Sequence, residues 1–495
     1  LIRETLSDEL TGGRRARLHR RIGEAMEQLY AANLEAHLAQ LSHHFFESHQ
    51  VGAADEAVKY STRAAQRQMA LAAYEEATRR YEMALQALKF KEPDETNQRC
   101  DLLVGLGEAQ NKAGQHLRAR ETFQIAASAA KRLGYFESLT DAVLGLEEVN
   151  WRPGLSDPNT VSLLAEVLTG LGEGNSVLKA RVLAAQARAL YLSGSVEMAD
   201  AKGQQAVAMA RELEDLPTLI RTLTVAAYAR RSPKDLNSRL SAHREAMRLA
   251  EDSGDVEMQM AVIANLVIDL MEAGDIDEFM RQMSIFESLA EKIRQPFYTY
   301  IAKALRTTMS ISSGRFDEAE QLTQQALAIG QRLRGQDATG VFGVHMFTLQ
   351  RMRGRLNEIA PAVKMFVQDQ SASAAWRPGL ALIYAELGLE DEARAEFEHL
   401  ATDDFAGIPT DGLWILCMAY LSEVCAFLND PHRAAVLYEM TLPYHAQNIG
   451  MAGGVAYCGA VSRYLGMLAA TMTRWEEAER HFEYALEMDA NTGSW

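Results

Sequence analysis

Apolar residues recur at helical spacing along almost the whole chain, in stretches that short breaks separate. The spacing between breaks is 40 residues for the seven breaks at Gly114, Gly154, Gly194, Lys234, Gly274, Gly314 and Gly354. It then changes to 34 residues at Gly388, about 42 at Asp430 and 43 at Thr473. A glycine after such a stretch ends a helix, because only glycine enters the left-handed conformation cheaply. The pattern predicts paired antiparallel helices from about Ala54 to Ala490, with no sheet.

Small and aromatic residues share one face of the predicted helices that follow several breaks. An alanine is followed four residues later by an aromatic residue, and three residues after that by a second alanine. The clearest cases and their relatives are Ala77/Tyr81/Ala84, Ala119/Phe123/Ala126, Ala478/Phe482/Ala485, Ala319/Thr323/Ala326 and Ala393/Phe397. Small residues let two helices approach closely, and the aromatic side chain fills the gap to the next pair. We therefore expect Ala119, Ala319 and Ala478 to be buried at helix contacts.

A repeat of about 40 residues is typical of helical arrays, in which each helix pair buries its apolar face against the next pair. The segments around Gly114 and Gly314 resemble tetratricopeptide repeats, although that family usually repeats every 34 residues or so. We predict an all-α, right-handed α-solenoid of tetratricopeptide-like helix pairs, with about ten to eleven repeats over residues 53–495. A set of unrelated helices would not place ten breaks on a nearly regular grid.

Length, charge and cysteine content narrow the class of protein. A chain of 495 residues exceeds what one hydrophobic core usually supports, which favours an array whose core grows along an axis. A net charge of −17 argues against direct binding of nucleic acid by this region. The longest apolar run, Leu413 to Leu421, is too short to cross a membrane. Four scattered cysteines predict a reducing, cytoplasmic location, and the start at Leu1 suggests a piece of a longer protein.

The motifs of common enzyme classes are missing from the sequence. No Gly-x-x-x-x-Gly-Lys-Ser/Thr motif is present, so the phosphate-binding loop of an ATPase cannot form here. The run Gly170 to Gly174 resembles half of a dinucleotide-binding motif, but it follows a helical stretch, and we interpret it as a loop. We expect no catalytic residues, no cofactor and no enzymatic activity. Any ATPase or cyclase activity would lie outside this chain.

Three further groups of residues have both a chemical and a structural interpretation. The histidines His37, His43, His44 and His49 lack the spacing of a helical metal site, so we expect no metal site there. Cys417 and Cys425 lie on one face of an apolar helix, which favours burial. The basic cluster contains Arg14, Arg15, Arg17, Arg20 and Arg21. Acidic residues nearby almost cancel its charge, which favours a solvated helix face.

The N-terminal residues carry a more specific resemblance. The segments Leu1 to Leu6, Arg14 to Ile22 and Leu41 to Phe45 resemble the winged-helix segment that joins the ATPase core to the repeats in LuxR-type regulators and nucleotide-cyclase-linked ATPases. These belong to the bacterial signal-transduction ATPases with numerous domains. The resemblance implies that residues 1–52 are a helical remnant of this linker. It also implies an upstream ATPase domain in the same polypeptide.

The first helix of each pair lines the concave surface of such a solenoid, which is where repeat proteins bind their partners. Residues 13, 6 and 3 positions before a break lie on the face of the first helix that is expected to look inwards. At the breaks at Gly194 and Lys234 these positions hold six Arg and Tyr residues on neighbouring helices: Arg181, Arg188, Tyr191, Arg221, Tyr228 and Arg231. Tyrosine and arginine carry much of the binding energy at interfaces, and paired arginines suit carboxylate or phosphate groups. We expect these side chains to be partly exposed, although arginines often only solvate helices.

Two functions are compatible with these patterns. The first is a regulatory module, the sensor arm of a multidomain ATPase that controls transcription or nucleotide-cyclase output. It would bind a protein, a peptide or a small anionic effector in its concave groove. The second is a structural scaffold that mediates self-association or assembly without an effector. The sequence identifies neither the ligand nor the output domain, and it leaves open whether the chain forms a homo-oligomer.

Overall fold

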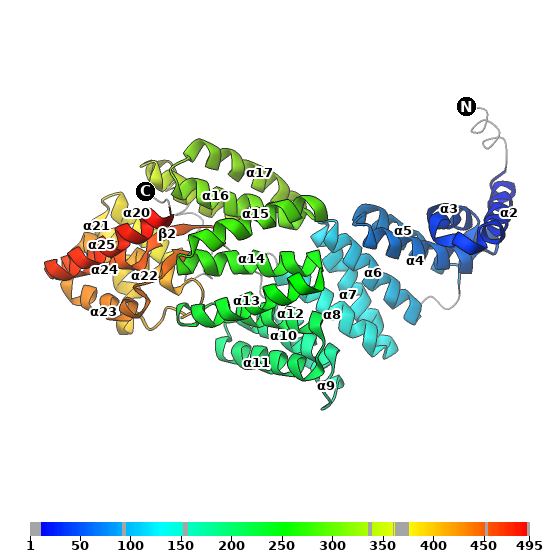
Figure 1. The fold of residues 1–495 in the computed structure, drawn as a ribbon, viewed down its shortest axis with the longest axis horizontal. Coiled ribbons are helices and arrows are strands. Elements are labelled where there is room, and N and C mark those ends of the chain that lie inside the picture. The colour runs from blue at the N-terminus through cyan, green and yellow to red at the C-terminus, as the bar shows by residue number, and fades with distance from the viewer. Residues whose placement is uncertain are drawn as a thin grey trace. The chain divides into compact units, whose positions relative to one another are not determined.

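The protein is described by a computed structural model that covers residues 11–91, 96–151, 157–334, 339–359, 361, 376–450 and 454–492. Helices make up nearly all of the described chain (Figure 1). They form two compact units. The first unit extends to Gly174 and includes the short stretches Arg294–Pro296 and Arg332–Arg334; the remaining residues from Asn175 onward form the second. The predicted break at Gly154 lies outside the described residues.

The first unit is built of short helix pairs that follow one another along the chain. Each helix packs on the next one in the sequence, as tetratricopeptide-like helix hairpins do. The helices are α2 (Gly12–Leu29), η1 (Ala31–His37), α3 (Leu38–Glu47), η2 (His49–Val51), α4 (Ala54–Ala70), α5 (Tyr74–Leu88), α6 (Asn97–Lys112), α7 (His116–Leu133), α8 (Phe136–Trp151) and α9 (Pro158–Gly170).

The second unit is also built of helix pairs that follow one another along the chain. Its helices up to the middle of the unit are α10 (Val177–Leu192), α11 (Val196–Leu213), α12 (Leu216–Tyr228), η3 (Pro233–Asp235), α13 (Leu236–Ser253), α14 (Val256–Ala273), α15 (Ile276–Ile293), α16 (Pro296–Ser312) and α17 (Phe316–Arg334). The rest are α18 (Thr339–Met352), α20 (Trp376–Glu386), α21 (Glu390–Leu400), η5 (Thr402–Phe405), α22 (Trp414–Leu428), α23 (Pro431–Thr441), η6 (Leu442–Tyr444), α24 (Val461–Thr471) and α25 (Trp475–Thr492). The predicted all-α fold of helix pairs is confirmed.

The corners of the helix pairs use the residues that the breaks predicted. Gly194 and Gly274 adopt φ values of +84° and +72°, which place them in the left-handed region that ends a helix. In several helices a side chain caps the N-terminus by accepting a hydrogen bond from a main-chain N–H of the first turn. Asp215 accepts a hydrogen bond from the main-chain N of Thr218, and Asp255 from that of Met258, both at 3.0 Å.

Close contact between helices depends on small residues that lie against aromatic rings. Ala119, Ala319 and Ala478 are buried, as predicted. The ring of Phe123 lies against Gly107 of α6, where an added Cβ would be only 2.7 Å from it. Phe482 packs in the same way on Gly466 of α24. Any larger residue at such a position would separate the two helices.

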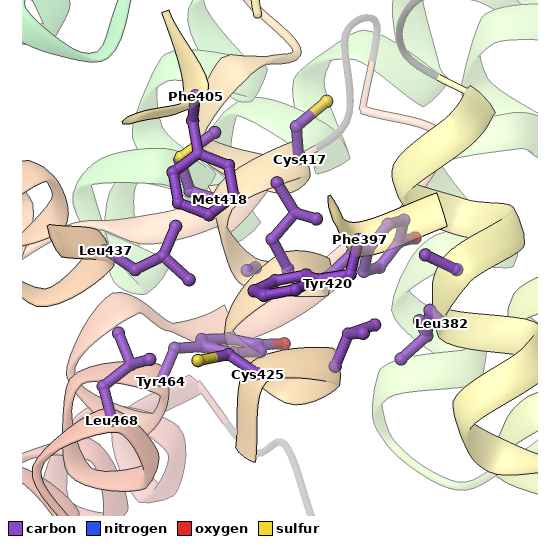
Figure 2. Packing of buried hydrophobic residues seen from close by; sticks show 14 of the residues in the cluster. Leu382, Phe397, Phe405, Cys417, Met418, Tyr420, Cys425, Leu437, Tyr464 and Leu468 are labelled. Carbon is purple, nitrogen blue, oxygen red and sulfur yellow. The ribbon is translucent and has the colours of Figure 1, made fainter. Parts of the chain in front are cut away.

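A hydrophobic core of the second unit surrounds α22 (Figure 2). This helix begins directly after Leu413 and contains the rest of the apolar run to Leu421. Its residues are buried on nearly every side, as expected for a helix that is apolar all round. Cys417 and Cys425 are buried, and burial raises the pKa of each thiol to about 12. Among the described residues, no helix is long and apolar enough to span a membrane.

The prediction that the array contains no sheet is wrong. Strands β1 (Asn448–Gly450) and β2 (Tyr457–Ala460) pair antiparallel, with Asn448 opposite Ala460 and Gly450 opposite Tyr457. Glycines at 450, 454 and 459 explain the departure, because glycine disfavours helix and permits tight turns. The hairpin interrupts the helix pairs between α23 and α24.

Replacing Ala119, Ala319 or Ala478 with leucine should destabilise the protein, because each methyl group lies at a closely packed helix contact. We expect each variant to lose about 1–3 kcal/mol of unfolding free energy through overpacking. Chemical denaturation followed by circular dichroism measures this loss. Gln124→Leu is the control for Ala119→Leu, since Gln124 is exposed on the same helix, α7. Equal stability of Ala119→Leu and Gln124→Leu would show that the repeat register is wrong.

Candidate functional site

The structure places the six predicted binding residues on and just after two neighbouring helices of the second unit. Arg181, Arg188 and Tyr191 lie on α10, whereas Arg221 and Tyr228 lie on α12, with Arg231 in the turn that follows. Exposure differs strongly among them. Arg221 is exposed and Arg181, Tyr191 and Tyr228 are partly exposed, but Arg188 and Arg231 retain only 6% and 5% of their accessible surface. The expectation of six partly exposed side chains therefore fails for these two arginines.

The burial of Arg188 follows from the position of α10. This helix packs against both α11 and α12, and its residues from Val182 to Leu190 are all buried. A helix with neighbours on two sides leaves little of its surface for solvent, so counting residues back from a turn overestimates exposure.

Tyr191, Tyr228 and Arg231 come together as one cluster. The two tyrosine rings meet edge to face, with centroids 5.9 Å apart. The guanidinium of Arg231 lies 4.7 Å from the centroid of the Tyr228 ring, a cation–π distance. Its Nη2 also donates a hydrogen bond of 3.1 Å to Oδ1 of Asn265 on α14. Three successive first helices, α10, α12 and α14, are thus connected through one row of side chains.

A distant segment of the same unit binds to this cluster. The main-chain N–H of Gly412 donates a hydrogen bond of 3.1 Å to the hydroxyl of Tyr191. A Cβ at position 412 would lie 3.0 Å from the main-chain oxygen of Arg231, so only glycine fits without displacement. Burial, together with Tyr228 and Asp411, raises the pKa of Tyr191, so the phenol stays protonated at neutral pH.

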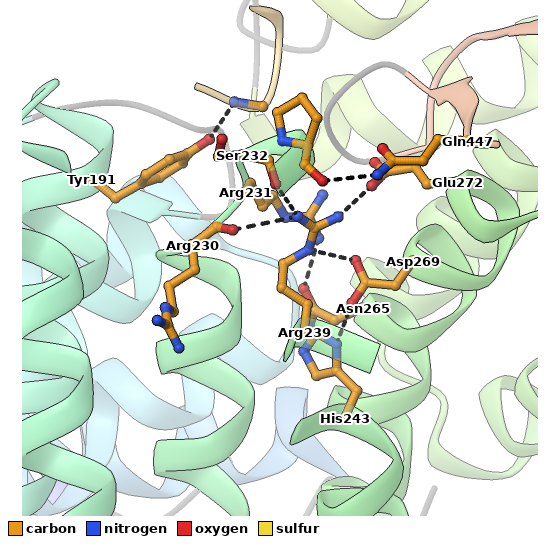
Figure 3. A network of polar contacts seen from close by, with 12 residues as sticks. Tyr191, Arg230, Arg231, Ser232, Arg239, His243, Asn265, Asp269, Glu272 and Gln447 are labelled. Carbon is orange, nitrogen blue, oxygen red and sulfur yellow. Dashed lines mark hydrogen bonds and ion pairs between the residues drawn. The ribbon is translucent and has the colours of Figure 1, made fainter. Parts of the chain in front are cut away.

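Behind the cluster lies a buried ionic network centred on Arg239 of α13 (Figure 3). Only 2% of Arg239 is exposed. Its Nε donates to Oδ1 of Asp269 at 2.9 Å, and its Nη2 bonds to Glu272. Its Nη1 donates to the main-chain oxygens of Ser232 and Arg230, at 2.8 and 3.3 Å. The guanidinium therefore fixes the turn that carries Arg231.

Asp269 is the electrostatic partner that makes this network stable. Its Oδ2 lies 2.7 Å from Nδ1 of His243, and its Oδ1 accepts from Arg239. Burial alone would raise the pKa of Asp269, but Arg239 and His243 outweigh burial and lower it to about 2. Burial and the charge of Asp269 raise the pKa of Glu272 despite Arg239. The site therefore holds Asp269 as a carboxylate.

The selection from the sequence missed this network because it considered only the first helix of each pair. Arg239 lies on α13, the second helix of its pair. A usable signal was present in α14, where Asn265 and Asp269 are one helical turn apart within an otherwise apolar sequence. Polar residues at such spacing in a buried helix need partners, and they indicate a buried polar contact.

The β-hairpin region also contacts these helices. The side chain of Gln447 donates to the main-chain oxygen of Pro233 at 3.0 Å, and that of Asn448 to the oxygen of Met271 at 3.2 Å. Thr308 on α16 donates to the main-chain oxygen of Gly454 at 2.8 Å. We call the face of α10, α12, α14 and α16 that makes these contacts the inner face. Main-chain groups of the C-terminal part take part in two of these contacts, at Gly412 and Gly454. In the other two, side chains of that part bind main-chain oxygens.

The opposite end of α10 and α12 has a different character. Arg221 lies seven residues before Tyr228, so about 10 Å along the helix axis, and Arg181 lies about 15 Å from Tyr191. Both arginines retain exposed surface. The C-terminal segments contact the Tyr191 end of these two helices, whereas the end with Arg181 and Arg221, which we call the arginine end, keeps solvent access.

Comparison with known proteins gives only distant structural similarity. No known protein family matches the sequence of the chain, and neither does any curated protein. The crystal structure of a Rap protein complexed with competence and sporulation factor is similar at 12% identity and a TM-score of 0.40, covering 71% of this chain and 99% of that one. Yeast Tom70 is similar at 13% identity and a TM-score of 0.36, covering 88% and 92%. Neither similarity identifies a ligand for this chain.

Gly412→Ala should weaken the attachment of the Asp411–Leu413 segment to the inner face. The added methyl group would press on Arg231 and Tyr191, and we expect a loss of about 1–3 kcal/mol of unfolding free energy. Chemical denaturation of the whole chain measures it. The matched control is Gly407→Ala, because nothing lies within 4 Å of a Cβ at that position. If both variants are as stable as the unmodified protein, the contact at Gly412 is not tight.

The charge of Asp269 should contribute to stability in a defined pH range. Its pKa is about 2 in the folded protein against an ordinary value of 3.8, so its stabilising effect is complete above pH 5 or so and is lost as the pH falls towards 2. Over this range the unmodified protein should lose on the order of 2 kcal/mol more unfolding free energy than Asp269→Asn. Denaturation curves at successive pH values measure the difference. If the unfolding free energies of the unmodified protein and of Asp269→Asn change equally with pH, Asp269 is not held ionised by Arg239.

Proposed function

We propose that this chain is a regulatory repeat module that binds a segment of a protein or peptide on its inner face. The observation that supports this function most is that the inner face already binds polypeptide main chain. Tyr191 accepts from the N–H of Gly412, and Thr308 donates to the carbonyl of Gly454. Side chains that satisfy the main chain of an extended segment bind it independently of its sequence, as peptide-binding proteins do.

The expected ligand is an acidic segment in an extended conformation. Arg181 and Arg221 offer positive charge at the arginine end, in a protein whose net charge is −17. Charge-assisted hydrogen bonds to carboxylates are the strong polar contacts at such surfaces. From Arg221 to Tyr228 is about 10 Å, which three residues of an extended peptide span. One segment can therefore contact both the arginine end and the Tyr191 end.

We further propose that such a ligand competes with the Asp411–Leu413 segment for the hydroxyl of Tyr191. The internal segment makes one hydrogen bond to Tyr191, and an incoming peptide would replace it with its own main-chain N–H. This exchange gives two arrangements of the second unit that differ in what occupies the inner face. A ligand that binds one arrangement better shifts the population towards it, which is the physical requirement for a sensor.

The wider context that we propose is the cytoplasmic sensor arm of a multidomain signal-transduction ATPase. The resemblance of the N-terminal residues to a winged-helix linker supports it. In this proposal residues 1–52 connect the repeats of 53–495 to the upstream ATPase domain. The gene should then encode a Gly-x-x-x-x-Gly-Lys-Ser/Thr motif upstream of Leu1 in the same frame, and its absence from the complete reading frame would contradict the ATPase context.

Peptide selection followed by binding measurements tests the inner-face proposal. Peptides selected by display on the whole chain should be acidic and should bind Arg181→Ala/Arg221→Ala at least about tenfold more weakly, because two charge-assisted contacts are lost. Fluorescence anisotropy measures the affinity, which should also fall as salt is added. The control is Arg248→Ala, which removes an exposed arginine from α13, a second helix.

Two outcomes would contradict this function. In the first, the selected peptides bind the double variant and the control equally well. Alternatively, selection yields no binder, while sedimentation shows that the chain assembles with itself. The second outcome would favour the structural scaffold.

A further inference from the structure

Three imidazole rings converge where α2 packs on α3 in the first unit. Nδ1 of His19 on α2 lies 3.0 Å from Nδ1 of His44 on α3. The ring of His43 is edge-on to that of His19, with centroids 5.5 Å apart. One ring nitrogen from each of the three residues lies within 4.8 Å of the other two. Three ring nitrogens from two helices thus lie close together.

The helix contact itself brings the rings together. Gly23 lies one turn after His19, and a Cβ there would be 2.9 Å from the ring of Phe45. The lack of a side chain at Gly23 lets α2 approach α3 closely next to the histidines. His43 and His44 directly precede Phe45, so the packing that buries Phe45 also positions both imidazoles.

These contacts change the grouping of histidines that the sequence suggested. His37 stacks on Tyr30 with ring centroids 3.7 Å apart, and its Nδ1 lies 2.9 Å from Gln40. His49 is buried, and its Nδ1 contacts the main-chain oxygen of Phe46. Two of the four histidines considered from the sequence therefore have other roles. His19, from another helix, takes their place beside His43 and His44.

We propose that His19, His43 and His44 form a binding site for a divalent transition-metal ion, with Zn²⁺ as the principal candidate. Imidazole nitrogens around tetrahedral zinc are about 3.4 Å apart, since each Zn–N bond is about 2.0–2.1 Å. This value lies between the 3.0 Å and 4.8 Å that bound the cluster. A hydrogen bond between His19 and His44 accounts for one pair of nitrogens only. It gives no reason for the third ring to converge on them.

The surroundings are compatible with a cation. The nearest basic side chain in the sequence, Arg20, is paired with Glu24 at 2.9 Å and donates to the main-chain oxygen of Val51 at 3.2 Å. His43 is exposed, so an ion can reach the cluster from solvent. Imidazole suits zinc, copper and nickel, and three such ligands leave a coordination position for water or another donor. A bound ion would connect α2 to α3 and stabilise that contact.

Metal titration of the whole chain, freed of metal with EDTA, tests this site. Isothermal titration calorimetry with Zn²⁺ should give one equivalent of binding, and Co²⁺ should give the visible absorption of nitrogen coordination. His19→Gln keeps a hydrogen-bonding side chain but lacks the imidazole. It should weaken binding by at least about tenfold, since even indirect partners of a metal site contribute that much. His43→Gln alters only an exposed side chain, so it should remove the ligand without disturbing folding.

The matched control is His37→Gln, which removes a neighbouring histidine outside the cluster. Its affinity for Zn²⁺ should equal that of the unmodified chain, and circular dichroism verifies that all variants are folded. The proposal is overturned if the chain binds no Zn²⁺ under these conditions. It is also overturned if His43→Gln and His19→Gln, when folded, bind Zn²⁺ as tightly as His37→Gln does.

Discussion

The close approach of neighbouring helices over small residues is the constraint on which the rest of this structure depends. Where Phe123 lies against Gly107, and where Ala119 and Ala319 are buried, no side chain holds the helices apart. A spacing set in this way repeats from pair to pair, so the first helices α10, α12 and α14 lie close enough for their side chains to form one row. The contact from Arg231 to Asn265 connects the turn after α12 to α14.

The main effect of the buried ion pair at this face is to fix the position of the turn that carries Arg231. Removing two charges from water costs about as much as their attraction returns, unless hydrogen bonds satisfy the remaining polar atoms. Arg239 meets this condition, because Asp269, Glu272 and two main-chain oxygens surround its guanidinium. The benefit is that the turn carrying Arg231 has one defined conformation. A binding surface with fixed side chains loses less entropy when a ligand arrives.

The parts of this fold that local chemistry determines were predictable from the sequence. Gly194 and Gly274 are predictable as corners because each is a glycine that follows an apolar stretch. Ala119 is predictable as buried because of its spacing from Phe123. The burial of Arg188 was not predictable in this way, since it depends on which helices flank α10. The binding of Gly412 to Tyr191 joins residues more than 200 positions apart, and no periodic pattern encodes such a contact. The convergence of His19 with His44 likewise depends on how α2 packs on α3, and the β-hairpin lies where glycines interrupt the repeat pattern.

The central claim is that the inner face binds polypeptide and that the chain's own Asp411–Leu413 segment competes with a ligand for it. Hydrogen–deuterium exchange of the intact chain, with and without a selected acidic peptide, tests this claim most directly. The amide of Gly412 is hydrogen-bonded to Tyr191 in the unliganded protein. The account predicts that the fragment containing Asp411–Leu413 exchanges faster when the peptide binds. Unchanged exchange of that fragment under saturating peptide would contradict the account.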